Sequence, residues 1–306
     1  MKNIPEIRIK GFFGGWKESL LEDNFDNSIK TNTWARIFLS DTKGEVLNIH
    51  YGDILIKFGS ILDLSNVNVP HIYNSKISDY NNFLQNGDVV FADTAEDETA
   101  GKAIEIANIQ NKKLVSGLHT IACHPKREFG NGFWGYYLNS PAFHSKIISL
   151  LQGIKVLSLS KSKLAKVEVN IPKEISEQQS IGTFFQNLDN LITEQKNKLE
   201  NLQKVKKSML CKMFPKKGQK VPDIRFKGFE GNWKEKKLGE ICILNKGKQI
   251  NKQTLSDKGK YYVLNGGMTP SGYTNKYNAS ENTISISEGG NSCGYVFYNK
   301  KHFWSG

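Results

Sequence analysis

The sequence predicts an α+β protein: a mixed α/β domain, then one long helix of coiled-coil type, then a partial second domain. Three observations lead to this prediction, namely an internal repeat, an uninterrupted helical segment between the two copies, and short apolar runs bounded by turn residues. We expect the first domain at residues 1–172, the long helix at 173–214, and a basic linker with an incomplete second domain at 215–306.

The internal repeat is visible in two short segments, which we call the first and second lead-in. Residues 4–18 read IPEIRIKGFFGGWKE and residues 221–235 read VPDIRFKGFEGNWKE, with ten of fifteen aligned positions identical at one offset of 217. A period this long indicates two copies of a whole domain rather than a solenoid. Adding the offset to residues 176–213 places a second long helix at 393–430, beyond Gly306. We therefore expect the second copy to be truncated.

The segment between the copies has the pattern of a long helix. From Glu174 to Phe214 there is no proline and a single glycine, Gly182. Apolar residues recur at alternating spacings of four and three, which is typical of a coiled-coil seam. We expect this seam to dock other subunits through Ile181, Phe185, Leu188, Ile192, Leu199, Leu202, Met209 and Met213. The alternative is an amphipathic helix that packs on its own domain.

Shorter patterns predict the elements of the first domain. Apolar runs bounded by Gly, Asn and Asp predict strands at 52–58, 87–92 and 114–123. Pro141 suits the first turn of a helix. One face of that helix would carry Phe143, Ile147, Ile148 and Leu151.

The charge of the chain is strongly basic and unevenly distributed. The net charge is +12, and residues 195–220 hold nine lysines and one glutamate, which is +8 of that total. Clustered lysines favour a polyanion, because each one placed on a phosphate releases condensed counterions. We expect this stretch to contact nucleic acid or an acidic partner. A basic but merely solvated surface is the alternative.

The remaining composition argues for a cytoplasmic protein without a catalytic or metal site. No apolar segment is long enough to cross a membrane, and the N-terminus lacks the apolar core of a signal peptide. The four cysteines are scattered, so neither a zinc site nor a disulfide framework is indicated. His119 and His124 flank Cys123, but alternation along a strand points them to opposite faces. Phosphate-loop, HExxH, GxSxG and Pro-Pro methyltransferase motifs are all absent.

One motif leaves an enzymatic alternative open. Pro222-Asp223 followed by Glu235-Lys236-Lys237 matches the PD…ExK pattern of metal-dependent nucleases, in which two carboxylates hold Mg²⁺. The first lead-in lacks the lysine at the equivalent position, Leu20. The pattern is thus more typical of a structural lead-in, and a self-contained restriction endonuclease is the less favoured reading.

Several longer segments together resemble one known family, the specificity subunit of Type I restriction–modification systems. The resemblance lies in YYLNSPAFHSKI (136–147), LSKSKLAKVEVNIP (159–172), EQQSIGTFFQNLD (177–189) and LQKVKKSMLCKMFP (202–215). In the second copy, residues 265–278 and 282–297 resemble another target-recognition domain.

The resemblance implies a non-catalytic, sequence-specific DNA-binding subunit. In that family each target-recognition domain reads half of a bipartite site on double-stranded DNA. The long helices set the half-site spacing and dock methyltransferase subunits, and a restriction/translocase subunit completes the complex. It implies no cofactor in this chain, with S-adenosylmethionine, ATP and Mg²⁺ held by the partners that methylate adenine and cut DNA. A truncated or silent recombination cassette is the alternative.

A homodimer through the spacer helix is a further expectation. Two chains that pair their seams over 181–213 would recreate a pseudo-symmetric arrangement by true two-fold symmetry. The recognised DNA site would then be palindromic.

Candidate DNA-binding residues carry amide, guanidinium, hydroxyl or charged groups on expected loops, as base reading in the major groove requires. For the loop that follows the strand at 87–92, a solvated turn is the alternative. In the first domain the candidates are Lys57, Ser60, Asp93, Thr94, Asp97, Thr99, Lys102, His119, Lys126 and Arg127, with Lys155, Lys161 and Lys163 for phosphates. In the second copy they are Lys246, Lys248, Ser271, Tyr273, Glu288, Asn291 and Ser292.

Overall fold

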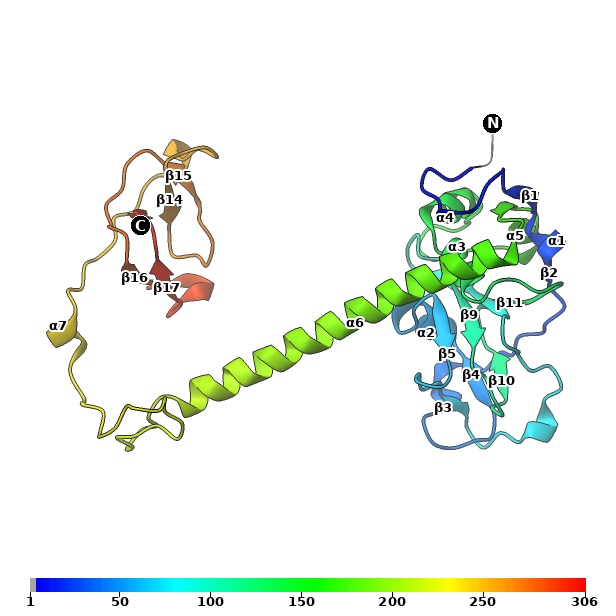
Figure 1. Cartoon of the computed structure of the whole chain (residues 1–306), viewed down its shortest axis with the longest axis horizontal. Helices are drawn as coiled ribbons and strands as arrows, with labels where there is room; N and C mark the ends of the chain where they lie inside the picture. Colours follow the sequence, from blue (N-terminus) through cyan, green and yellow to red (C-terminus); the bar gives the residue numbers. More distant parts are fainter. Residues whose placement is uncertain (1–3) are drawn as a thin grey trace. The chain divides into compact units, whose positions relative to one another are not determined.

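The computed structural model of the chain describes residues 4–306 (Figure 1). Its contacts divide the chain into two units, one ending at Val205 and the other running from Lys206 to Gly306. The long helix α6, Ile175–Lys212, continues across this division. The predicted α+β class is confirmed, since one long helix links two sheet-containing units.

Strands in two larger sheets form the centre of the first unit. A five-stranded mixed sheet has the order β2-β11-β7-β9-β5, and its strands are Phe25–Asp26, Thr120–Pro125, Val89–Ala92, Ala103–Ala107 and Ile61–Asp63. A four-stranded sheet has the order β10-β4-β6-β3, with strands Leu114–Ser116, Leu47–Ile49, His71–Ile72 and Leu39–Ser40.

Two small sheets and several short helices complete this unit. The sheets pair β1 with β13 and β12 with β8, at Lys17–Leu20, Glu168–Ile171, Leu157–Ser158 and Thr94–Ala95. The α-helices are α1 (Leu21–Asn24), α2 (Tyr51–Ile56), α3 (Phe133–Leu138), α4 (Pro141–Ile148) and α5 (Lys161–Ala165). Two 3₁₀ turns lie at Arg36–Phe38 and Ile77–Asp79.

The predicted strand at 87–92 is confirmed as β7, which is buried along its whole length. Its side chains alternate between two cores: Val89 and Phe91 join a cluster with Trp134, whereas Val90 and Ala92 join a cluster with Ile54. Burial on both faces explains why this strand reads as a continuous apolar run rather than an alternating one.

The predicted helix at Pro141 is also confirmed. Ser140 caps it by accepting a hydrogen bond from the Phe143 backbone N–H, and Pro141 occupies its first turn. Phe143 and Ile147 are buried, but Ile148 is 37% exposed, so the apolar face is narrower than predicted.

Two predicted strands are wrong. Residues 52–58 lie mainly in helix α2, because the His50 side chain caps the first turn and accepts a hydrogen bond from the Gly52 N–H. A short apolar run does not distinguish a strand from a buried helix by periodicity. Residues 114–123 form two strands, β10 and β11, in different sheets. His119, with φ of 54°, adopts the left-handed conformation that breaks them apart.

Helix α6 lies inside the predicted range of 173–214 and is two residues shorter at each end. Its beginning is embedded in the first unit, where Gln178 accepts from the Gly130 N–H and donates to the Pro172 carbonyl, both at 2.9 Å. A Cβ on Gly182 would lie 2.2 Å from the Asn131 carbonyl oxygen. Glycine is therefore required where the helix meets this loop.

A buried carboxylate fixes the first lead-in to the start of α6. Glu177 is 1% exposed and its two oxygens accept from Nε and Nη2 of Arg8, both at 2.7 Å. Trp16 Nε1 also donates to Glu177, at 3.2 Å. A bidentate guanidinium–carboxylate pair sets direction as well as distance.

The seam of α6 is exposed beyond its embedded beginning. Leu188, Ile192 and Leu199 are 42%, 51% and 57% exposed. These leucine and isoleucine side chains do not pack on the domain, so the helix is not stabilised by its own fold along this stretch. The exposure favours a coiled-coil seam over an amphipathic helix that packs on its own domain.

The second unit is smaller and less compact. It contains a three-stranded sheet in the order β15-β14-β18 and a β16–β17 hairpin. Helix α7 spans Leu238–Ile241, and 3₁₀ turns lie at Lys252–Thr254 and Gly290–Ser292. The strands are β14 (Tyr261–Leu264), β15 (Gly272–Thr274), β16 (Thr283–Ile286), β17 (Val296–Asn299) and β18 (Trp304–Ser305). Val263 and Phe303 are its buried apolar residues.

The duplication extends from the sequence to the backbone pairing. In the first unit β4 and β10 are parallel, and the Gly117 N–H donates to the Ile49 carbonyl at 2.9 Å. In the second unit β14 and β18 are parallel, and the Gly306 N–H donates to the Leu264 carbonyl at 2.8 Å. This supports a correspondence between FWSG (303–306) and the strand that begins at Leu114.

We predict that Glu177→Ala lowers the free energy of unfolding by about 1–3 kcal/mol, because it removes an acceptor of three hydrogen bonds at a buried position. Urea denaturation followed by circular dichroism measures the change. Glu194→Ala, which alters an exposed position of the same helix, should be within experimental error of wild type. Equal stability of the two variants would contradict the anchoring role of Glu177.

Candidate nucleic-acid interface

One end of the five-stranded sheet gathers several of the predicted residues. Asp93 and Thr94 follow β7, and His119 precedes β11, whose Thr120 is paired with Ala92. Thr94 Oγ1 donates to Asp93 Oδ1 at 2.7 Å. His119 Nδ1 lies 3.4 Å from both the Thr94 hydroxyl and the Asp93 carboxylate.

The beginning of α2 completes this end of the sheet. The ring of Tyr51 contacts the His119 ring edge to face, with centroids 5.3 Å apart, and stacks at a tilt on His50 at 4.6 Å. We call Tyr51, Asp93, Thr94 and His119 the His119 face. His119 is exposed and the other three are half-buried. Together they combine hydrogen-bond donors, acceptors and an aromatic ring.

The chemistry of the His119 face suits recognition better than catalysis. Asp93 and Thr94 both approach the same ring nitrogen of His119, whereas a nucleophile–base–acid relay needs contacts at opposite ring nitrogens. Hydroxyl, carboxylate and imidazole groups are the kinds of side chain that read base edges.

A charged cluster supports α2 next to this face. Asp53 is buried and pairs with Arg36 and, at 3.1 Å, with Lys57. The charge of Lys57 is therefore partly compensated. Burial lowers the pKa of the nearby His50 imidazole, which keeps its Nδ1 free to accept the helix-capping hydrogen bond.

A hairpin adds Lys155 to the same end. Strand β12 pairs with β8 so that Ser158 lies opposite Thr94, and the Leu159 N–H donates to the Asp93 carbonyl at 2.7 Å. The tip of this hairpin, residues 152–156, is exposed. Lys155 is thus exposed, as the predicted phosphate contact requires.

Four further candidates make hydrogen bonds within the fold near this end of the sheet, namely Asp97, Thr99, Lys102 and Ser60. Asp97 accepts hydrogen bonds from the Thr99 N–H and hydroxyl, at 2.9 and 2.5 Å, and the hydroxyl contact lowers the pKa of Asp97. Both residues are exposed on the turn that they hold. Lys102 donates to the carbonyls of Leu55 and Phe58, at 3.1 and 2.9 Å.

Lys102 is therefore occupied inside the fold, where burial lowers the pKa of its ammonium group. Ser60 is similarly placed, since its carbonyl accepts the Glu105 N–H and its hydroxyl accepts from Asn139. Lys102 and Ser60 are therefore not part of the His119 face.

The other end of β11 carries a separate, basic group. Lys126 and Arg127 follow Pro125, so the length of the strand separates them from His119 by about 20 Å. Lys126 donates to the Glu22 carbonyl at 2.7 Å, and Arg127 donates to Asn24 and lies over the Phe129 ring. Lys161, which donates to the Asn27 carbonyl, and the exposed Lys163 lie on α5.

In the second unit the candidates form a loop group and an edge strand. Lys246 lies 3.6 Å from Glu288, with both side chains exposed, and Asn291 and Ser292 are in the 3₁₀ turn that follows. Ser271 and Tyr273 lie on or beside edge strand β15. The Lys248 N–H donates to the Ser305 carbonyl, and its side chain is exposed.

Other functional classes find little support in the geometry. The part of the chain that the structure describes holds no group of three or more His, Cys, Asp or Glu side chains placed to bind a metal ion. Asp223 of the nuclease-like motif is instead paired with Lys216 at 2.7 Å. No helix within residues 4–306 is both long enough and apolar enough to cross a membrane.

Sequence reasoning missed His50, Tyr51 and Arg36. All three depend on α2 being a helix, whereas its residues were predicted to form a strand. A signal was present, because a helix that begins at Tyr51 places an acidic residue, Asp53, at its third position. Nothing in the sequence pairs Arg36 with Asp53 across 17 residues.

The chain thus combines a polar face at one end of a sheet with a long helix whose apolar seam is exposed. The chain belongs to the family described as Type I restriction modification DNA specificity domain, whose model matches residues 40–203 and 230–306. The two matched stretches fall one in each copy of the repeat. Domains of this family provide DNA specificity and are non-catalytic.

Individual relatives agree with this family. A type I specificity subunit of Mycoplasma pneumoniae is 47% identical over 75 residues, and one of Mycoplasma genitalium is 41% identical over 75 residues. Each match covers 24% of this chain and only 20% or 19% of the relative's own length. The crystal structure of a Type I restriction–modification S subunit from M. genitalium has a similar fold, with a TM-score of 0.58 and 16% identity over 100% of this chain and 73% of that one.

We predict that the pH dependence of stability contains a contribution from His50. Because burial lowers its pKa in the folded state, the unfolded chain binds more protons once the pH falls below about 6.5. The stabilising contribution is complete above that pH and is lost as the pH falls through the folded pKa. Urea denaturation at pH 7.5 and 5.5 should show a larger loss for wild type than for His50→Asn, which retains a neutral capping acceptor. Identical losses would contradict the assignment.

Proposed function

We propose that the chain is the DNA-reading component of a Type I restriction–modification complex in the cytoplasm, and that the His119 face reads bases in one half of the site. The observation that carries this proposal is the convergence of Tyr51, Asp93, Thr94 and His119 at one exposed end of the sheet. Such mixed donors and acceptors distinguish bases, whereas lysines alone do not.

The basic group at the other end of β11 suits the phosphate backbone. Lys126, Arg127 and Lys163 are exposed, and phosphate contacts position a protein without reading sequence. The loop group of Lys246, Glu288, Asn291 and Ser292 would act in the same way as the His119 face for a second half-site. The net charge of +12 supports association with DNA in general.

The exposed seam of α6 is the proposed docking surface for methyltransferase subunits. Its apolar side chains are about half exposed from Leu188 to Leu202, and a stripe of this length is typical of an assembly surface. The partner subunits would supply S-adenosylmethionine-dependent adenine methylation and, with a restriction/translocase subunit, ATP- and Mg²⁺-dependent cleavage.

A second copy of the chain is the alternative occupant of this seam. The alternating spacing of its apolar residues suits pairing with an identical helix. A homodimer of this kind would recognise an inverted repeat, because each copy would present the same His119 face.

We predict different effects at the two ends of β11. In complex with a methyltransferase subunit, Thr94→Ala/His119→Ala should relax sequence preference by roughly 10- to 100-fold at the bases it reads. Lys126→Ala/Arg127→Ala should weaken binding to all sequences and reduce the salt dependence of affinity by about two phosphate contacts. Selection from a random duplex library and binding titrations at several salt concentrations measure the two effects. An unchanged preference in the Thr94/His119 variant would disprove the assignment of this face.

We predict that Leu188→Asp and Leu199→Asp each weaken binding of the methyltransferase subunit by about 100-fold, because a buried unpaired charge is strongly unfavourable. Asn190→Asp adds the same charge on the opposite side of α6 and should have little effect. Co-purification and mass measurement of the complexes check both outcomes and also detect a homodimer. Wild-type complexes from Leu188→Asp would show that the seam does not dock a subunit.

A further inference from the structure

The two lead-ins fold into the same turn. In the first, Arg8 Nη1 donates to the Gly14 carbonyl at 2.5 Å, and in the second Arg225 Nη1 donates to the Gly231 carbonyl at the same distance. Gly14 and Gly231 both have φ of 80°, which favours glycine. The repeated sequence thus positions a guanidinium group in the same way twice.

In the first lead-in that guanidinium holds a helix. Its other N–H groups bind the carboxylate of Glu177 in the first turn of α6, assisted by the indole N–H of Trp16. Ile181, four residues further along α6, packs against the apolar core of the first unit. The two residues together fix where the helix begins.

In the second lead-in the same groups have no carboxylate. Within residues 4–306, the hydrogen bond of the Arg225 side chain is to the Gly231 carbonyl, and the Trp233 side chain makes a ring contact with Phe214, with centroids 6.0 Å apart. Arg225 is half-buried. Its Nε and Nη2 groups therefore have no acceptor among residues 4–306.

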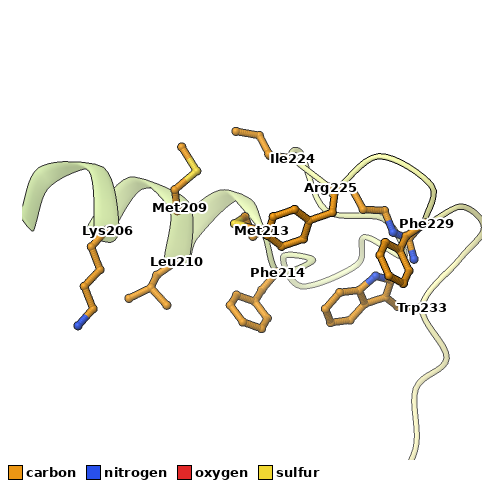
Figure 2. Close-up of a pocket in the computed structure, with 10 residues that line it drawn as sticks. Lys206, Met209, Leu210, Met213, Phe214, Ile224, Arg225, Phe229 and Trp233 are labelled. Atoms are coloured by element: carbon orange, nitrogen blue, oxygen red, sulfur yellow. The ribbon is translucent and has the colours of Figure 1, made fainter. Parts of the chain in front are cut away.

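An apolar pocket adjoins this guanidinium. The second lead-in packs on the end of α6, where the Ile224 N–H donates to the Lys212 carbonyl at 3.0 Å. The resulting pocket has a volume of about 510 Å³ and is lined on the helix by Met209, Leu210, Met213 and Phe214 and on the lead-in by Phe226, Phe229 and Trp233. Figure 2 shows Arg225 beside Phe229 at the edge of this cluster.

We propose that Arg225 and this pocket form a docking site for the first turn of a partner helix that carries a glutamate four residues before an apolar side chain. The carboxylate would take the place at Arg225 and Trp233 that Glu177 takes at Arg8 and Trp16. The apolar side chain would enter the pocket. The α6 helix of a second copy does not supply this turn, because its Glu177 is 1% exposed and held by its own Arg8.

A lead-in would then make two contacts, and each of the two copies makes one of them in this structure. The second lead-in shows how the segment packs on the end of one helix, and the first shows how it binds the start of another. A lead-in that does both joins the two helix ends at one point. This surface is separate from the His119 face, so the inference does not depend on base recognition.

Fluorescence anisotropy with a labelled synthetic peptide tests the proposal. The peptide has the sequence of residues 173–194, which contains Glu177 and Ile181, and is titrated with the full chain. We expect saturable binding that weakens about tenfold with Arg225→Ala, as for loss of a charge-assisted pair. The peptide change Glu177→Gln should weaken it about tenfold as well, and combining both changes should add little. Lys227→Ala, a charge removal two residues away, should bind as wild type.

The double-mutant cycle separates the proposed contact from other binding. The Glu177→Gln change is made only in the peptide, so a folding defect of the protein cannot produce its effect. Effects of the two changes that simply add would overturn the proposal, because the peptide would then bind elsewhere, for example on the seam. Absence of saturable binding, or wild-type affinity of Arg225→Ala, would overturn it equally.

Discussion

The carboxylate of Glu177 determines where the long helix begins, and the proposed assembly depends on that point. A helix of 38 residues is about 57 Å long, so a small change in its direction at the start displaces its far end by many ångströms. Arg8 and Trp16 bind the carboxylate, and Gly182 allows the closest approach to the Asn131 loop. Because these contacts are buried and directional, the part of the seam in the first unit is held in a set position relative to the His119 face.

The positive and polar residues of the first unit fall into three groups, which the composition of the chain does not distinguish. The residues that we propose to read bases lie at one end of β11, and the lysine and arginine that we propose to contact phosphates lie at the other. A third kind is internal: Lys102 uses its ammonium group to bind the carbonyls of Leu55 and Phe58. A basic residue on an expected loop is therefore not automatically available to DNA, since backbone carbonyls compete for it.

The elements that the sequence predicted well are those with a strong local pattern. Helix α6 has over four heptads of regular spacing without proline, and β7 is a β-branched and aromatic run between turn residues. The errors lie where distant contacts decide the structure. Residues 52–58 became α2 because His50 caps them and Arg36 pairs with the buried Asp53. The candidate site was predicted in part for the same reason: Asp93, Thr94 and His119 were found on loops, but Tyr51 was not.

The most direct test of the account is to map methylated adenines after the chain is combined with a methyltransferase subunit and genomic DNA. We predict methylation at one defined sequence motif, with the adenine at a fixed position in it, and none when either protein is omitted. The motif should be bipartite if both units read DNA, or an inverted repeat if two chains pair through α6. Methylation scattered without a motif, or the same motif in the absence of the chain, would contradict its role as the component that reads DNA.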